Sequence, residues 1–278
     1  MTRTGIAALA RLDAHEVLRS RWPAVVTVIY AALAALLTFA AMRESSVLEF
    51  TGTGRVLLSF AHALLFLLPL LALGSTAQTL NRAREDGTLE LLFGQPVLPS
   101  DYYAAVTLTR CALLFVPFAF LVAALPLLTW AAFTDPIPWP YLGRTLLIGL
   151  ALIWAFVGLG LALSASVANQ AKAAVLALLV WASAVALVDF ALISLLLQWR
   201  LNAVSVFFLA ALNPVQCARM ALLSGQDPEL SIFGPVGFFL AHKVGAGGLL
   251  ALGVGWPFVV GTVAWWFGLR RFRSGDLV

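Results

Sequence analysis

Few residues of this chain have side chains that catalyse reactions or bind metals, and their spacing forms no catalytic or metal-binding motif. His15-Glu16 begins like the helix of a zinc protease, but Arg19 stands where the second histidine ligand is needed. The two lysines, Lys172 and Lys243, lie in no Gly-Lys-Ser/Thr phosphate-binding loop, which excludes ATP hydrolysis of that kind. We therefore expect a chain that is not itself an enzyme and binds no cofactor.

A second group of polar residues lies within long apolar stretches of the chain, and consists of His62, Gln78, Arg110 and Asp189. An ionisable side chain is costly inside a bilayer, so such residues are candidates for a transport pathway or another function. The alternative is that each ionisable side chain reaches the membrane surface, because each lies within a few turns of the end of its apolar stretch. The sequence leaves both interpretations open.

The most polar internal segment is 81–101, in which charged residues precede a short apolar run. We expect Thr88 to cap a short helix that Gly94 and Pro96 end. Such a helix suits docking into a groove on a soluble partner. The alternative is a solvated linker whose leucines pack under the rest of the protein. The candidate coupling residues are Arg84, Glu85, Gly87, Thr88, Leu89, Glu90 and Leu91.

The segment 198–245 contains two apolar pieces, 203–212 and 230–241, that are too short to cross a bilayer. We interpret the segment as a cap over the non-cytoplasmic end of the protein. Its candidate residues for a periplasmic partner or a gate are Asn213, Pro214 and Arg219. A charged residue beside a helix break is placed to contact a partner or to line an exit path. A buried ion pair between Arg219 and Asp189 is the competing interpretation.

The elements that must position these residues are long apolar runs. Each run approaches or exceeds the roughly 20 residues that cross a bilayer as a helix. Hydrophobic residues make up 62% of the chain and charged residues only 11%, which is typical of an integral membrane protein. A membrane β-barrel would need alternating polar and apolar residues, whereas these runs are apolar on every side. We expect an all-α polytopic membrane protein whose transmembrane domain, 23–278, has six transmembrane helices. The runs are 24–42, 56–80, 102–133, 145–168, 171–197 and 244–269.

Lysines and arginines near the ends of the runs predict the orientation of the protein. Ten of them lie on the side that holds both termini, and six lie on the other side over longer loops. Because cytoplasmic loops carry the excess of positive charge, we expect both termini to be cytoplasmic, as an even number of spans requires. The basic residues are spread over the ends of the spans and form no single patch, so we expect no nucleic-acid partner.

Residues 1–22 are expected to form an amphipathic helix on the cytoplasmic membrane surface. Ile6, Leu9 and Val17 share one face at 100° per residue, and basic residues line the opposite face. Asp13 interrupts the apolar side. The alternative is an ordinary positively charged flank of the first span.

The block Glu85-Asp86-Gly87-Thr88-Leu89-Glu90-Leu91-Leu92 with Pro96, placed between the second and third of six spans, resembles the ABC-2 type permease family. Within that family, the chain is most similar to the NosY-like permeases of nitrous-oxide-reductase maturation. The motifs for this branch are Leu212-Asn213-Pro214, Arg219, Leu222-Leu223-Ser224-Gly225 and the tail 269–277. The resemblance covers essentially the whole chain and implies the type V exporter-like permease fold.

The resemblance also implies an assembly in the bacterial cytoplasmic (inner) membrane. It predicts a homodimer bound to two copies of a cytoplasmic ABC ATPase, which holds the ATP and Mg²⁺, and a periplasmic β-helical protein on the opposite face. The complex would support assembly of the copper site of nitrous oxide reductase. Two other functions stay open. One is an ABC-2 exporter permease for a lipid, drug or other small molecule. The other is a membrane-anchored redox or scaffold subunit in which His62 and His242 bind haem.

Overall fold

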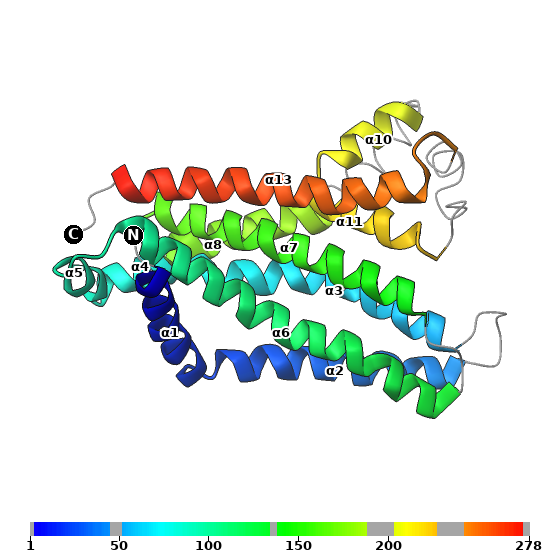
Figure 1. The fold of residues 1–278 in the computed structure, drawn as a ribbon. Helices are drawn as coiled ribbons and strands as arrows, with labels where there is room; N and C mark the ends of the chain where they lie inside the picture. Colours follow the sequence, from blue (N-terminus) through cyan, green and yellow to red (C-terminus); the bar gives the residue numbers. More distant parts are fainter. Residues whose placement is uncertain (1–2, 45–51, 134–137, 188–202, 227–241, 275–278) are drawn as a thin grey trace.

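The computed structural model describes residues 3–44, 52–133, 138–187, 203–226 and 242–274, and within these ranges the chain is helical with short connections and contains no strand (Figure 1). The helices carry the chain along the long axis of an elongated bundle, apart from the short elements at its two ends. The elements are α1 (Arg3–Arg19), α2 (Trp22–Glu44), α3 (Gly52–Thr76), α4 (Thr79–Glu85), α5 (Thr88–Phe93), α6 (Pro99–Phe133), α7 (Trp139–Ser166), α8 (Gln170–Ala182), the π-helical turn η1 (Ser183–Leu187), α10 (Ala203–Ala211), α11 (Pro214–Leu223) and α13 (Gly245–Ser274).

The predicted count of six spans is supported only in part. In the described ranges, four helical segments are long and apolar enough to cross a membrane, and a fifth is reached if α1 and α2 count as one span bent by 64°. However, α2 has 23 residues, about 35 Å of helix, and is by length sufficient for a hydrocarbon core of about 30 Å without α1. The predicted span 171–197 is described only as far as Leu187, so its full length lies outside the described residues.

The short elements divide between the two ends of the bundle. Figure 1 shows α1, α4 and α5 at the same end as the last turn of α13, and α10 and α11 at the opposite end. We call these the α5 end and the α11 end. The helix α1 lies across the α5 end at a steep angle to α2, as an amphipathic surface helix would. Its polar residues Arg11, His15 and Arg19 are exposed and Val17 is buried, while its position on a membrane surface stays a prediction.

The centre of the bundle is α7, whose small residues let α13 approach closely. A Cβ atom on Gly158 would overlap the carbonyl oxygen of Gly261, and one on Gly268 would lie 2.8 Å from the Cα of Ala162. Contacts of this kind let two membrane helices pack backbone against backbone. One helical turn after Ala162, Ser166 donates its hydroxyl to the carbonyl of Ala162 (2.7 Å).

Helix α7 also fixes the break between α3 and α4. The hydroxyl oxygen of Ser164 accepts a hydrogen bond from the backbone N–H of Leu80 (3.0 Å) in the first turn of α4. Gly160 leaves room for the side chain of Thr76, the last residue of α3, which a Cβ atom would displace. The short turn after α7 is closed by Asn169, whose side chain accepts from the backbone N–H of Lys172 (3.1 Å) and so caps α8. Helices α7 and α8 are therefore joined by a short capped turn.

Candidate functional site

The candidate coupling segment, residues 79–93, folds as two short helices joined by a left-handed turn. Gly87 has a φ of 69° and stands at the N-cap position of α5, a conformation that favours glycine. The prediction that Thr88 caps this helix is wrong, because Thr88 is its first residue and no side chain caps it. Gly94 ends the helix, as predicted. The turn therefore depends on the backbone freedom of Gly87.

The two leucines of α5 have opposite environments. Leu89 is fully buried in the core, whereas Leu91 is 76% exposed beside the exposed Glu90. The sequence left two interpretations of this segment, a docking helix and a linker packed under the protein, and each of them describes one of the two leucines. Leu89 packs under the bundle as a linker residue would, and Leu91 is presented outward as a docking residue would be.

Aromatic packing joins α5 to the two longest helices. The ring of Phe93 lies 6.3 Å, centroid to centroid, from both Tyr102 at the start of α6 and Phe272 in the last turn of α13. The fully buried Phe272 also packs on Tyr103 (5.7 Å), which in turn packs on Trp265 (5.6 Å). Edge-on and tilted aromatic pairs at these distances are attractive, so a displacement of α5 strains its contacts with α6 and α13.

The charged residues of the segment lie around α4. Glu85 is exposed, and its carboxylate accepts a hydrogen bond from the side-chain amide of Gln170 (2.5 Å), the first residue of α8 after the α7–α8 turn. Arg84 is half-buried. The end of α4 is thus linked to the α7–α8 turn by a contact that a partner protein at this surface could reach. Sequence reasoning had no signal for this contact, which joins residues 85 positions apart.

The surface helix α1 is held on α6 by a buried ion pair. The carboxylate of Asp13 lies 3.3 Å from the guanidinium of Arg110, and their side chains are only 9% and 13% exposed. Beside them, Thr109 donates its hydroxyl to the carbonyl of Ala10 (3.3 Å). Burial raises the pKa of Asp13 above its ordinary value, and Arg110 opposes that rise. Arg110, predicted as an intramembrane polar residue, therefore serves to hold α1.

From the sequence alone, Asp13 is an interruption of the apolar face of α1, whereas in the structure it is the partner of Arg110. An acidic residue on the buried face of a surface helix, together with an arginine inside a span, is a signal for an ion pair between them.

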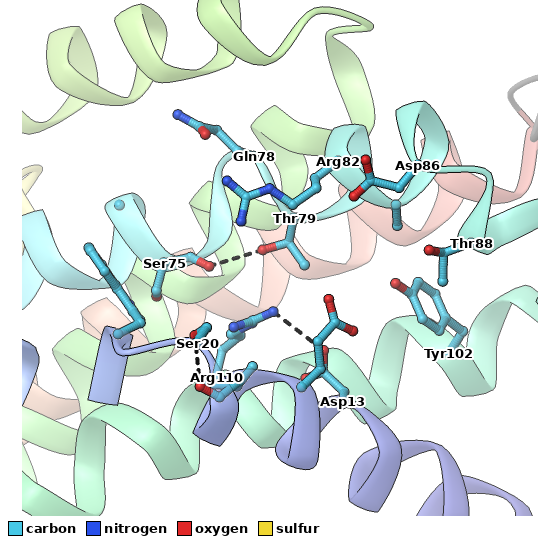
Figure 2. Close-up of a pocket in the computed structure, with 15 residues that line it drawn as sticks. Asp13, Ser20, Ser75, Gln78, Thr79, Arg82, Asp86, Thr88, Tyr102 and Arg110 are labelled. Atoms are coloured by element: carbon cyan, nitrogen blue, oxygen red, sulfur yellow. Dashed lines mark hydrogen bonds and ion pairs between the residues drawn. The ribbon is translucent and has the colours of Figure 1, made fainter. Parts of the chain in front are cut away.

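A polar pocket of about 510 Å³ lies where α1, the α3–α4 junction and α6 meet, at the α5 end. Figure 2 shows Asp13 and Arg110 on one wall and Gln78, Thr79 and Arg82 on the other. Gln78, predicted as an intramembrane polar residue, is thus part of the pocket wall. His62 is half-buried in α3 and is not among the lining residues.

At the α11 end, Asn213 makes two connections. Its side-chain oxygen accepts from the backbone N–H of Val215 (2.9 Å) and caps α11, in which Pro214 is the first residue. Its amide nitrogen donates to the carbonyl of Ala184 (2.6 Å) in the π-helical turn η1. A π turn displaces the regular backbone hydrogen bonds of a helix. The side chain of Asn213 supplies a hydrogen-bond donor to a carbonyl of this turn. Asn213 is buried and acts in the structure as a link between α11 and η1.

Arg219 lies in α11 with its guanidinium 6.0 Å from the ring centroid of Phe66 in α3, a cation–π distance. Asp189 lies outside the described residues, so the competing ion pair between Asp189 and Arg219 stays a prediction. The second apolar piece of the predicted cap, 230–241, also lies outside them.

Arg144 in α7 was not predicted as a functional residue, yet it organises the α11 end. Its guanidinium donates to the carbonyl of Ala221, the hydroxyl of Ser224 and the carbonyl of Ala246, each at 3.3 Å. These acceptors come from the end of α11 and the start of α13. Arg144 therefore joins α7, α11 and α13 into one unit. The sequence offered only an arginine near the end of a span, with no sign of its acceptors.

Within the described ranges, histidine, cysteine and acidic side chains form no group of three that could hold a metal ion. All of the described elements are helices, four helical segments are long and apolar enough to cross a membrane, and α1 and α5 lie at the same end of the bundle. The chain belongs to the ABC-2 family of transporter proteins, whose model matches residues 7–273. It is thus the membrane-spanning permease subunit of an ABC transporter.

Two curated relatives narrow the comparison. The chain is 29% identical over 233 residues to the probable ABC transporter permease protein NosY of Stutzerimonas stutzeri. The aligned region covers 81% of this chain and 84% of the relative. The chain is also 28% identical over 228 residues to the probable ABC transporter permease protein NosY of Pseudomonas aeruginosa. That aligned region covers 79% of this chain and 82% of the relative. These similarities confirm the resemblance to the NosY-like permeases.

Proposed function

We propose that this permease belongs to an ATP-driven complex that supports copper-site maturation of nitrous oxide reductase. The proposal takes its direction from the two relatives named NosY. In the complex, two copies of the chain span the inner membrane with both termini in the cytoplasm. Two copies of a separate ABC ATPase bind at the α5 end and hold ATP and Mg²⁺, and a periplasmic β-helical protein binds at the α11 end. The permease itself binds no cofactor.

The observation that carries the docking part of the proposal is the division of α5 into two faces. Leu91 and Glu90 are exposed, while Leu89 and Phe93 anchor the same helix in the core. A short helix with an outward apolar side chain is a suitable insert for a groove on a soluble partner. Because the inner face is anchored, a force on Leu91 reaches the bundle without unfolding the segment. Arg84, Glu85, Gly87 and Thr88 flank this face and complete the proposed contact.

Continuous contacts support transmission from the α5 end to the α11 end. Phe93 contacts α13 through Phe272, and the same α13 carries Trp256, whose indole N–H donates to the carbonyl of Leu212 (3.0 Å) after α10. Arg144 then ties the start of α13 to α11, the helix of Arg219. A rigid helix that contacts both ends carries a tilt from one end to the other. In the proposal, ATP-driven closure of the ATPases tilts α13 and moves the surface around Asn213, Pro214 and Arg219.

Deleting the gene for this chain from its host tests the maturation role. Nitrous oxide reductase purified from the deletion strain should contain less copper than the wild-type enzyme and lack its visible copper absorption. Restoring the gene should restore both, and restoring Leu91→Asp should not. A reductase with normal copper, together with retention of a lipid or drug inside the deletion strain, would instead establish the exporter function.

A further inference from the structure

The polar pocket at the α5 end has unsatisfied groups in its wall. Three lining residues have a buried polar atom without a hydrogen-bond partner in the described part of the chain, namely Asp13 Oδ2, Trp22 Nε1 and Arg110 Nε. Asp13 is only 7% exposed. An unpaired buried polar group costs about 1–3 kcal/mol, and one acceptor and two donors of this kind belong to residues that line the pocket. The pocket volume, about 510 Å³, is also typical of a ligand site. The wall is therefore suited to a ligand that both accepts and donates hydrogen bonds.

The charged residues that line the pocket are of both signs. Carboxylates come from Asp13, Glu16 and Asp86, and guanidinium groups come from Arg82 and Arg110. Figure 2 shows Asp13, Asp86, Arg82 and Arg110 around the pocket. A simple anion would meet the carboxylates, and a simple cation would meet the guanidinium groups. A metal ion is a poor candidate, because the described residues contain no group of three suitable ligands. A ligand with an anionic and a cationic group side by side matches both sets.

The surroundings of the pocket identify the source of such a ligand. One wall is the surface helix α1, and Trp22 at the start of α2 is the kind of residue found at the level of lipid headgroups. An apolar groove of about 700 Å³ between α1, α2 and α6 shares Val17 with the polar pocket. The groove is lined by exposed side chains such as Leu18, Leu108 and Phe120. A polar pocket beside an apolar groove at this depth has the shape of a phospholipid site.

We propose that this pocket binds the zwitterionic headgroup of a membrane phospholipid, a phosphodiester with a primary ammonium group, while an acyl chain lies along the apolar groove. Trp22 and Arg110 donate N–H groups to the phosphate, and Asp13 and Glu16 accept from the ammonium. Asp86 and Thr88 also line the pocket, so the lipid contacts the coupling segment and α1 together. Binding of the headgroup does not depend on what the complex matures or exports, and holds if the proposed function fails.

Native mass spectrometry of the full-length chain in detergent measures this binding directly. We expect phosphatidylethanolamine to bind about tenfold more tightly than phosphatidylcholine or phosphatidylglycerol with the same acyl chains. The reason is that a trimethylammonium group donates no N–H and glycerol carries no positive charge. Trp22→Phe keeps an aromatic ring but removes the indole N–H donor, and should weaken phosphatidylethanolamine binding about fivefold. Glu16→Gln, which lies at an exposed position, should also weaken it.

Matched controls are Trp139→Phe and Glu90→Gln, which are exposed and lie outside the pocket and should leave lipid binding unchanged. Equal binding of the three lipids, unaffected by Trp22→Phe and Glu16→Gln, would mean non-specific surrounding lipid and would overturn the proposal. Tighter binding of phosphatidylglycerol would overturn the zwitterionic assignment. Soluble glycerophosphoethanolamine that displaces the lipid at equal concentration would show that no acyl chain is recognised, which would contradict the lipid source.

Discussion

The residue that most changes the interpretation of this chain is Asp13. In the sequence it interrupts an apolar face, and in the structure it pairs with Arg110 and fastens α1 to α6. Removing one partner of a buried pair leaves an uncompensated charge, which costs more than the pair itself contributes. The pair therefore specifies where the surface helix lies more than it stabilises the fold.

A double-mutant cycle tests this role. Asp13→Ala should lower the free energy of unfolding by about 3–5 kcal/mol, because Arg110 is left buried and unpaired. Asp13→Ala with Arg110→Ala should recover part of that loss, which thermal unfolding in detergent can measure. Strictly additive losses would mean that the two side chains do not interact.

Other features at this scale could be predicted only in part. The break before α5 was predicted, but it was assigned to a Thr88 cap, whereas the left-handed φ of Gly87 makes it. The opposite exposure of Leu89 and Leu91 could not be predicted, because a six-residue helix shows too little periodicity to identify its inner face.

At the scale of elements, the ends of α2, α3, α6, α7 and α13 lie within six residues of the predicted runs. Such runs can be predicted because the bilayer sets the length of a span. The end of the run 171–197 lies outside the described residues. The helix α11 was missed as an element, since its mixed sequence with Gln216 and Arg219 has neither the length nor the apolar content of a span. Its place depends on contacts far apart in the sequence. Asn213 links it to η1 and Arg144 links it to α7, and neither contact leaves a local signal.

The close packing of α7 and α13 can be tested with two glycines of the same helix. Gly261→Ala should destabilise the protein by about 1–3 kcal/mol, because the new Cβ would lie 2.7 Å from the Cα of Ala155 and 2.8 Å from the carbonyl oxygen of Trp154. Gly255→Ala is the control. A Cβ there meets nothing within 4 Å, so the change should be neutral or slightly stabilising in thermal unfolding. Equal effects of the two changes would contradict the packing described for α7 and α13.

At the scale of the whole molecule, the orientation in the membrane stays a prediction from the arginine asymmetry. Both termini should be cytoplasmic. A reporter fused after Val278 should be active in the cytoplasm, and one inserted within 225–229 should be active in the periplasm. A periplasmic signal at Val278 would reject the topology of six spans and place the α5 end on the wrong side for an ATPase.

The whole-molecule account depends on the α5 end as the receiving face for the ATPase. At this end, Asp13–Arg110 joins α1 to α6, Phe93–Phe272 joins α5 to α13, and Glu85–Gln170 joins α4 to α8. Sequence patterns located these segments individually. Their meeting at one end could be inferred only after the spans were assembled into a bundle.

Photocrosslinking from Leu91 in intact membranes tests the central claim most directly. A photoreactive amino acid at position 91, which is 76% exposed on α5, should crosslink to the ABC ATPase that works with this permease. The same amino acid in place of Trp139, which is 66% exposed at the first residue of α7, should not. Crosslinks to the ATPase from position 139, or none from position 91 in an assembled and active complex, would contradict the account.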